Sequence, residues 1–167
     1  TCALPIFSER KGLDRKYFNQ VWADKQSATF KLIKQFPKNP RLIEFFSRIK
    51  DQNIKIAVAS NSVRETVKLA LLSIGVMEFV DYYVSNEDVS RTKPYPEMYW
   101  QCMTALNAIP KTTVIIEDSH IGRQGAIDSG SHLVPVRNSF DLTEEKIQEA
   151  LDILNGVTRS EEHTSEL

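Results

Sequence analysis

Cysteine is scarce in this sequence, which has only Cys2 and Cys102 among its 167 residues. Two cysteines are too few for a disulfide framework or a cysteine-based metal site, and their scarcity suits a reducing cytoplasm. Long apolar runs are absent as well: none approaches the ~20 residues of a membrane-spanning helix, and we find no signal peptide. Positive and negative charges nearly balance, and the formal net charge is −1. We therefore expect neither a membrane nor a nucleic acid as partner.

The length and composition are those of a single globular domain with at most a small appendage. Hydrophobic residues make up 41% of the sequence and charged residues 26%, which is ordinary for a soluble protein. The sequence has no internal repeat and no low-complexity linker. It starts with Thr1 and not with Met, so we expect the true beginning to be missing.

Residues 14–36 have the apolar spacing of a helix, and Pro37 and Pro40 interrupt the pattern. We expect the apolar side chains of this segment to be packed as core between two helices: Tyr17, Phe18, Val21, Trp22, Leu32, Ile33 and Phe36. Asn39 and Pro40 form a good N-cap and first position for the next helix. From Ile54 onward, strand patterns alternate with helix patterns, which is typical of a doubly wound parallel sheet. The predicted fold class is therefore α/β, with a helical lobe over residues 1–37.

Strands are predicted at residues 54–59, 82–84, 114–116 and 132–136. Helices are predicted over residues 63–74, closed by Gly75, from Pro96 onward, after Ser119 and after Thr143. The small residues Gly122, Gly125 and Ala126 are expected to let the helix after Ser119 pack closely. The last nine residues, RSEEHTSEL, have no apolar period, so we expect them not to continue the preceding helix. They are identical to one translated frame of a common sequencing adapter. We interpret residues 159–167 as a non-native tail and exclude His163 from any site.

Two adjacent carboxylates, Glu117 and Asp118, follow a β-branched strand and precede a helix capped by Ser119. In an open α/β sheet, ligands bind at the carboxyl ends of strands, so this pair is expected to face a site. Mg²⁺ prefers one or two carboxylates together with phosphate oxygens, which makes the pair a candidate metal site. The alternative is that both acids simply favour the positive end of the helix.

Two further groups suit phosphate chemistry. Ser60 follows the strand at residues 54–59, and its hydroxyl and the N–H groups of Asn61 and Ser62 could bind an anion. Lys93 precedes Pro94, where a fixed ammonium could neutralise a phosphoryl group. The alternatives are a helix cap for Ser60 and a solvated surface position for Lys93.

The order of these motifs resembles the haloacid dehalogenase superfamily, and within it the β-phosphoglucomutase-like branch of phosphatases and phosphomutases. The resemblance covers residues 39–137 and rests on three motifs: Ser60-Asn61, Lys93-Pro94 with Pro96-Glu97, and Glu117-Asp118-Ser119 with Gly122, Ala126 and Gly130. It implies that residues 1–37 are part of a helical cap and that residues 38–158 form the α/β core. It also implies that Ser60 and Asn61 hold the phosphoryl group, that Lys93 bridges this group to the nucleophile, and that Asp118 and Glu117 form the Mg²⁺ site.

One part of the family pattern is absent. The first motif of the family is an Asp-x-Asp-x-Thr/Val stretch after a strand in the middle of the sheet, and its first Asp is the nucleophile. Asp14, Asp24 and Asp51 lie in helical, charged contexts without such a strand. We therefore expect a fragment that lacks the nucleophile, has little or no activity and is poorly stable because strand edges are exposed.

The leading hypothesis is a Mg²⁺-dependent phosphatase of a small phosphorylated metabolite, cytoplasmic and monomeric when full length. A phosphomutase and a non-catalytic binding member of the fold remain open alternatives. A dehalogenase would leave the acidic pair without a role, and a response-regulator receiver would place the acidic pair before the hydroxyl and the lysine. Arg91, Arg123 and His120 are expected to be surface residues outside the site.

Overall fold

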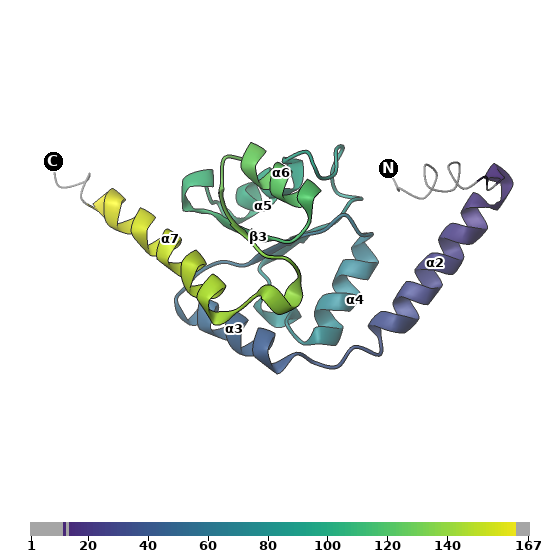
Figure 1. Ribbon diagram of the computed structural model, residues 1–167, viewed down its shortest axis with the longest axis horizontal. Coiled ribbons are helices and arrows are strands. Elements are labelled where there is room, and N and C mark those ends of the chain that lie inside the picture. Colours follow the sequence, from purple (N-terminus) through teal and green to yellow (C-terminus); the bar gives the residue numbers. More distant parts are fainter. Residues whose placement is uncertain (1–11, 13, 163–167) are drawn as a thin grey trace. The chain divides into compact units, whose positions relative to one another are not determined.

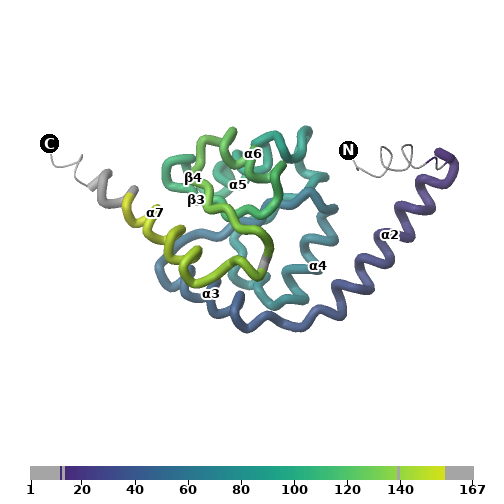
Figure 2. The backbone as a smooth tube through the Cα atoms, in the orientation of Figure 1, coloured from purple at the N-terminus to yellow at the C-terminus, as the bar shows by residue number. Residues whose placement is uncertain are grey.

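The computed structural model describes residue 12 and residues 14–162. The chain divides into two compact units: the first holds the residues up to Ile56 together with Ser62–Val80, and the second holds Ala57–Asn61 and the residues from Asp81 onward. Figure 1 labels the main helices of both units and strand β3, and Figure 2 traces the same chain as a tube. The boundary at residue 37 between a cap and a core remains a prediction.

The first unit is helical. It contains η1 (Arg15–Tyr17), α2 (Phe18–Ile33), α3 (Pro40–Asp51), α4 (Arg64–Ile74) and η2 (Met77–Phe79). The predicted start of α3 is confirmed, because the Asn39 side chain accepts a hydrogen bond from the Leu42 N–H and Pro40 is the first helical residue. The predicted end of α4 is also confirmed: Gly75 has a φ of 85°, the left-handed conformation that closes many helices.

The expectation of core packing for the apolar side chains of the first helical segment is wrong for its exposed members and holds for Ile33, which is buried. Tyr17 is 51% exposed and Trp22 is 40% exposed, and Leu32 and Phe36 are exposed as well. Apolar periodicity shows which side of a helix is apolar but not what covers it. In the first unit α2 packs mainly against α4, and its buried residues are Gln26 and Ile33.

The second unit contains two parallel strand pairs. β1 (Ala57–Ala59) pairs with β2 (Tyr82–Val84), and β3 (Val114–Glu117) pairs with β4 (His132–Pro135), as Figure 2 shows for the second pair. β1 is shorter than the predicted strand at residues 54–59, because it extends only where β2 lies opposite. In the described part of the chain, β1 and β3 each pair with one strand only. The predicted α/β class, with parallel strands and flanking helices, is confirmed.

Helix α5 (Glu97–Leu106) connects the two strand pairs through its apolar side chains. Tyr99 and Met103 form a core cluster with Ile115 of β3, against which Ala59 of β1 also packs. On another part of α5, Met98 and Cys102 cluster with Val84 of β2. Packing against both strand pairs holds the ends of β1 and β3 near one another.

Helix α6 (His120–Asp128) packs on β3 and β4, and α7 (Glu144–Glu162) contacts the same strands. α7 includes residues 159–162, so the expectation that this segment does not continue the helix is wrong there. Glu is a good helix former, and extending an existing helix costs little. Residues 163–167, with His163, lie outside the described residues. None of the described helices is long and apolar enough to cross a bilayer.

Candidate active site

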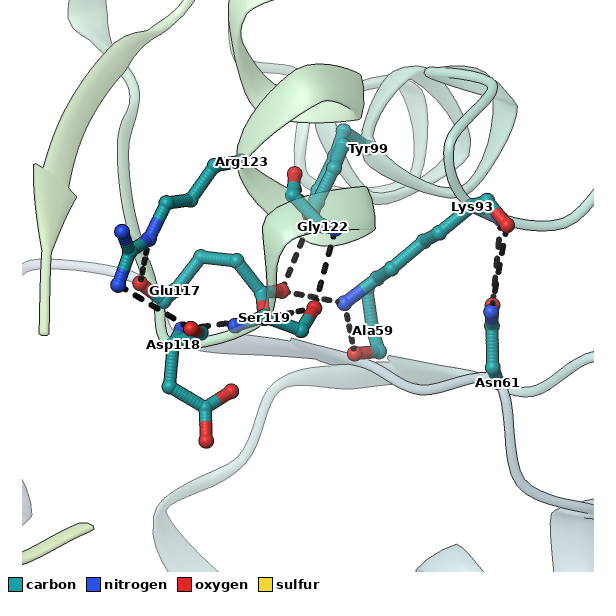
Figure 3. A network of polar contacts seen from close by, with 9 residues as sticks. All are labelled: Ala59, Asn61, Lys93, Tyr99, Glu117, Asp118, Ser119, Gly122 and Arg123. Atoms are coloured by element: carbon teal, nitrogen blue, oxygen red, sulfur yellow. Dashed lines mark hydrogen bonds and ion pairs between the residues drawn. The ribbon is translucent and has the colours of Figure 1, made fainter. Parts of the chain in front are cut away.

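Lys93 lies at the ends of both β1 and β3. Its ammonium donates to the carbonyl oxygen of Ala59, the last residue of β1, at 3.0 Å, and to Glu117 Oε2, at the end of β3, at 2.6 Å. Figure 3 shows this side chain reaching between the two strand ends. The Lys93 and Glu117 side chains are only 8% and 9% exposed. Lys93 is therefore a buried, paired cation, and the alternative of a solvated surface lysine is wrong.

Two side chains hold the loop that carries Lys93. Asn61 accepts a hydrogen bond from the Lys93 N–H at 3.2 Å and donates to the Lys93 carbonyl at 3.4 Å. The Glu97 carboxylate accepts from the backbone N–H groups of Ser90 and Arg91, at 2.7 and 2.8 Å. These contacts fix the loop from both sides and bring two of the predicted motifs, Asn61 and Lys93, into direct contact.

Ser60 directly follows β1, and its N–H donates to the Val84 carbonyl of β2 at 3.0 Å. Helix α4 has Val63 and not Ser60 as its N-cap, so the helix-cap alternative for Ser60 is wrong. The phosphate-binding roles of Ser60, Asn61 and Lys93 remain predictions.

The Glu117 carboxylate is saturated with hydrogen bonds. Oε1 accepts from the N–H groups of Asp118 and Ser119 and from the Ser119 hydroxyl, at 3.1, 3.0 and 2.8 Å. Oε2 accepts from Lys93 and, at 2.9 Å, from the Tyr99 hydroxyl. Burial by itself raises the pKa of Glu117, but hydrogen bonds from Lys93 and Ser119 and the Lys93 charge outweigh it and lower the pKa to about 2. In this geometry Glu117 supports the site through Lys93 and does not offer a free oxygen to a metal.

Asp118, unlike Glu117, has a carboxylate that faces solvent. Its side chain is exposed, and among the described residues its carboxylate has no hydrogen-bond or ion-pair partner. Figure 3 shows the carboxylate directed away from Lys93 and Glu117. A free, hard oxygen donor fits Mg²⁺, which often binds one or two carboxylates and completes its shell with water and phosphate oxygens. The described residues contain no group of three metal-ligating side chains, so Asp118 would supply only part of a metal's ligands.

Sequence analysis missed Tyr99 as a member of this cluster. The sequence placed Tyr99 on the helix that starts at Pro96, but nothing in it indicated that the side chain is buried or where its hydroxyl would go. The hydroxyl donates to Glu117 Oε2 and also lies 3.1 Å from the Gly122 carbonyl oxygen. The Lys93 ammonium lies 5.1 Å from the centre of the Tyr99 ring, within the range of a cation–π contact. Burial and the neighbouring Glu117 carboxylate raise the pKa of Tyr99, so the hydroxyl keeps its proton.

Two glycines let α6 approach this cluster. A Cβ atom at Gly122 would collide with the carboxyl group of Glu117, and one at Gly125 would lie 2.9 Å from the Pro94 carbonyl oxygen. The predicted role of these small residues in close packing is thus explained by what they contact. Ser119 is the N-cap of α6, as predicted, and accepts a hydrogen bond from the Gly122 N–H.

Of the three residues set aside as surface residues, two are exposed. His120 and Arg91 are exposed, and the Arg91 guanidinium stacks on the Tyr95 ring at 4.5 Å. Arg123 differs, because its guanidinium donates to the backbone carbonyl oxygens of Glu117 and Asp118. The expectation that Arg123 is a solvated surface residue is therefore wrong.

The sequence matches a family profile and several curated proteins. The profile of the haloacid dehalogenase-like hydrolase family matches residues 7–136. A phosphorylated carbohydrates phosphatase of Thermotoga maritima is 28% identical over 130 residues, covering 76% of this chain and 59% of that protein. Validoxylamine A 7'-phosphate phosphatase of Streptomyces hygroscopicus subsp. limoneus is 28% identical over 116 residues, covering 70% of this chain and 54% of that protein. The chain thus spans less than two thirds of the length of these curated relatives.

The fold is shared with solved structures. β-Phosphoglucomutase from Clostridium difficile superposes with a TM-score of 0.70 at 20% identity, covering 89% of this chain and 73% of that one. An identity this low indicates a common fold and no more. The family profile, in contrast, matches well over half of the sequence. This chain belongs to the haloacid dehalogenase-like hydrolase family.

Proposed function

We propose that the protein containing this chain is a Mg²⁺-dependent phosphatase that hydrolyses a small, sugar-phosphate-like metabolite through an aspartyl-phosphate. The observation that carries the proposal is the buried Lys93 ammonium at the ends of β1 and β3. Two of its three N–H donors are used by Ala59 and Glu117, and no third hydrogen-bond acceptor for it is found among the described residues. A held cation with a spare donor suits a phosphoryl oxygen. The two curated relatives, phosphatases of phosphorylated carbohydrates and of validoxylamine phosphate, support this class of substrate.

Each residue of the cluster has a proposed role. Ser60 and Asn61 would bind the phosphoryl group, and Lys93 would neutralise its charge. Asp118 would hold Mg²⁺, which supplies further positive charge to the phosphate when bound. Glu117 would hold the Lys93 ammonium in place, as its ion pair with Lys93 indicates.

The nucleophile is proposed to come from outside this sequence. Asp14 caps η1 by accepting from the Lys16 N–H, and Asp24 accepts from Gln20 within α2, so both serve helices. β1 and β3 each have an edge without a strand partner in the described part of the chain. A strand beside those edges would end next to Lys93, where a nucleophilic carboxylate is needed. The chain by itself would then bind phosphate weakly and turn nothing over.

The test is phosphate release by the whole protein from a panel of sugar phosphates, with and without a Mg²⁺ chelator. We expect chelation to abolish turnover and Asp118→Asn to lower it about 100-fold or more. Asp128→Asn is the matched control, since Asp128 lies at the other end of α6 and, among the described residues, its side chain accepts from Gln124 alone. Turnover that resists chelation, or equal activity of the two variants, would contradict the proposal. Isomerisation of a sugar phosphate without phosphate release would favour the phosphomutase alternative.

A further inference from the structure

Arg123 binds three backbone carbonyl groups at the ends of β3 and β4. Its Nε donates to the Glu117 carbonyl oxygen at 3.3 Å, and its Nη2 donates to those of Asp118 and Val136 at 3.1 and 2.6 Å. Figure 3 shows the guanidinium over the turn that joins β3 to α6. The planar guanidinium carries several N–H donors in a fixed arrangement, which is what allows one side chain to reach three acceptors.

The position of this arginine is unusual for a cation. Arg123 lies near the amino end of α6, where the helix dipole disfavours positive charge. Carbonyl groups at the ends of β3 and β4 offset that cost, because their oxygens carry partial negative charge. The side chain is therefore held by the turn, and the turn by the side chain.

The residue enclosed by these contacts is Asp118. Its N–H donates to Glu117 Oε1 at 3.1 Å, and its carbonyl oxygen accepts from Arg123. Both hydrogen-bonding groups of its backbone are thus bound to charged side chains, whereas its own carboxylate is exposed and unpartnered among the described residues. A fixed backbone under a free carboxylate limits the directions in which that carboxylate can point.

We propose that Arg123 is a positioning residue for the Asp118 carboxylate and, resting on the proposed function, for the Mg²⁺ that this carboxylate would hold. Arg123 acts through the backbone of the β3–α6 turn and touches neither metal nor substrate. Residues that orient a metal ligand in this way commonly change metal affinity about 10- to 100-fold when substituted.

The test compares Arg123→Lys with wild type in the whole protein. Lysine keeps the charge, but a single ammonium cannot reproduce the planar contact with three carbonyl groups. Mg²⁺ binding is measured by calorimetry and by the amide chemical shifts of Asp118 and Ser119. We expect the Mg²⁺ affinity to fall about 10- to 100-fold, with KM for the phosphoester unchanged at saturating Mg²⁺. Arg137→Lys is the control, because the Arg137 side chain is 85% exposed and its one ion pair within the described part of the chain is with Asp141.

The outcomes separate the two proposals. Wild-type Mg²⁺ affinity in Arg123→Lys, even with a lowered melting temperature, would overturn the positioning role and leave the phosphatase proposal standing. Absence of Mg²⁺ binding by the wild-type protein would overturn the proposed function and the inference that rests on it. Should Arg123→Lys fail to fold, Arg123→Gln is measured in its place. Loss of the fold in both variants would make Arg123 purely structural and would also overturn the positioning role.

Discussion

Removing either partner of the buried Lys93–Glu117 pair should destabilise the protein, but not equally. In Glu117→Gln the Lys93 ammonium loses its carboxylate partner, and of its contacts with described residues the Ala59 carbonyl and the Tyr99 ring remain. An uncompensated buried charge of this kind typically costs about 3–5 kcal/mol. In addition, the NH₂ group of the glutamine would face N–H and O–H donors that bind the Glu117 carboxylate in the wild type, which adds to the cost.

In Lys93→Met the remaining buried charge is the Glu117 carboxylate, and its other hydrogen-bond donors still stabilise it. Glu117 keeps four donors, namely the N–H groups of Asp118 and Ser119 and the hydroxyls of Ser119 and Tyr99. The free energy of unfolding should then fall by about as much as one hydrogen bond to a charged group contributes, about 1.5–3 kcal/mol. We therefore expect Glu117→Gln to be the more destabilising of the two substitutions.

The pH dependence follows from the direction of the Glu117 shift. The pKa of Glu117 is lowered from 4.5 to about 2 in the folded protein. A folded-state pKa below the unfolded value stabilises the protein above pH 4.5, and this stabilisation, about 3 kcal/mol, is lost as the pH falls from 4.5 toward 2. The difference in unfolding free energy between wild type and Lys93→Met should therefore shrink over that range.

The assay is urea unfolding of the whole protein, followed by far-UV circular dichroism at pH 7 and again near pH 3. If Glu117→Gln and Lys93→Met lower the unfolding free energy equally at pH 7, the remaining hydrogen-bond donors do not stabilise the Glu117 carboxylate in the absence of Lys93, and the argument is refuted. A wild-type advantage over Lys93→Met that is the same at both pH values would refute the assigned pKa shift.

Three further outcomes are expected. Tyr99→Phe should lower the free energy of unfolding by about 1–3 kcal/mol, because Glu117 loses a hydrogen-bond donor, and it should also lower kcat. Tyr95→Phe loses no hydrogen bond of the described residues and should behave as wild type. Equal kcat values for the two variants would count against a role for the Tyr99 hydroxyl. Gly122→Ala should destabilise because its Cβ would collide with Glu117, whereas Gly156→Ala, which has open space, should stabilise by up to about 1 kcal/mol, as urea unfolding will show. The chain as printed should show no Mg²⁺-dependent phosphate release, because the nucleophile is proposed to come from outside this sequence. It should also show no cooperative high-temperature melt, because β1 and β3 each have an edge without a partner strand among the described residues. Measurable turnover or such a melt would contradict this expectation.

Local signals in the sequence were sufficient to predict several helix ends. Asn39 with Pro40, Ser119 and Gly75 mark helix ends in the structure where the sequence indicated them. These signals work from sequence because a cap and the N–H or carbonyl group that it satisfies lie only a few residues apart. The order of Asn61, Lys93 and Glu117 along alternating strands and helices was likewise enough to predict that these three residues meet, which they do through hydrogen bonds at Lys93.

The roles of individual side chains depended on the tertiary structure. The aromatic residues Tyr17 and Trp22 have core-like spacing but are partly exposed, since burial depends on what packs against a helix. Sequence analysis paired Glu117 with Asp118 as metal ligands, whereas the structure directs Glu117 to Lys93, 24 residues away, and leaves Asp118 exposed. Arg123 shows the same limit, because one of its acceptors is Val136 of the segment after β4. Sequence alone therefore determined the local elements and the order of the motifs. Only the folded chain decided which donor faces which acceptor, because those partners are distant in sequence and meet only when helices and strands pack.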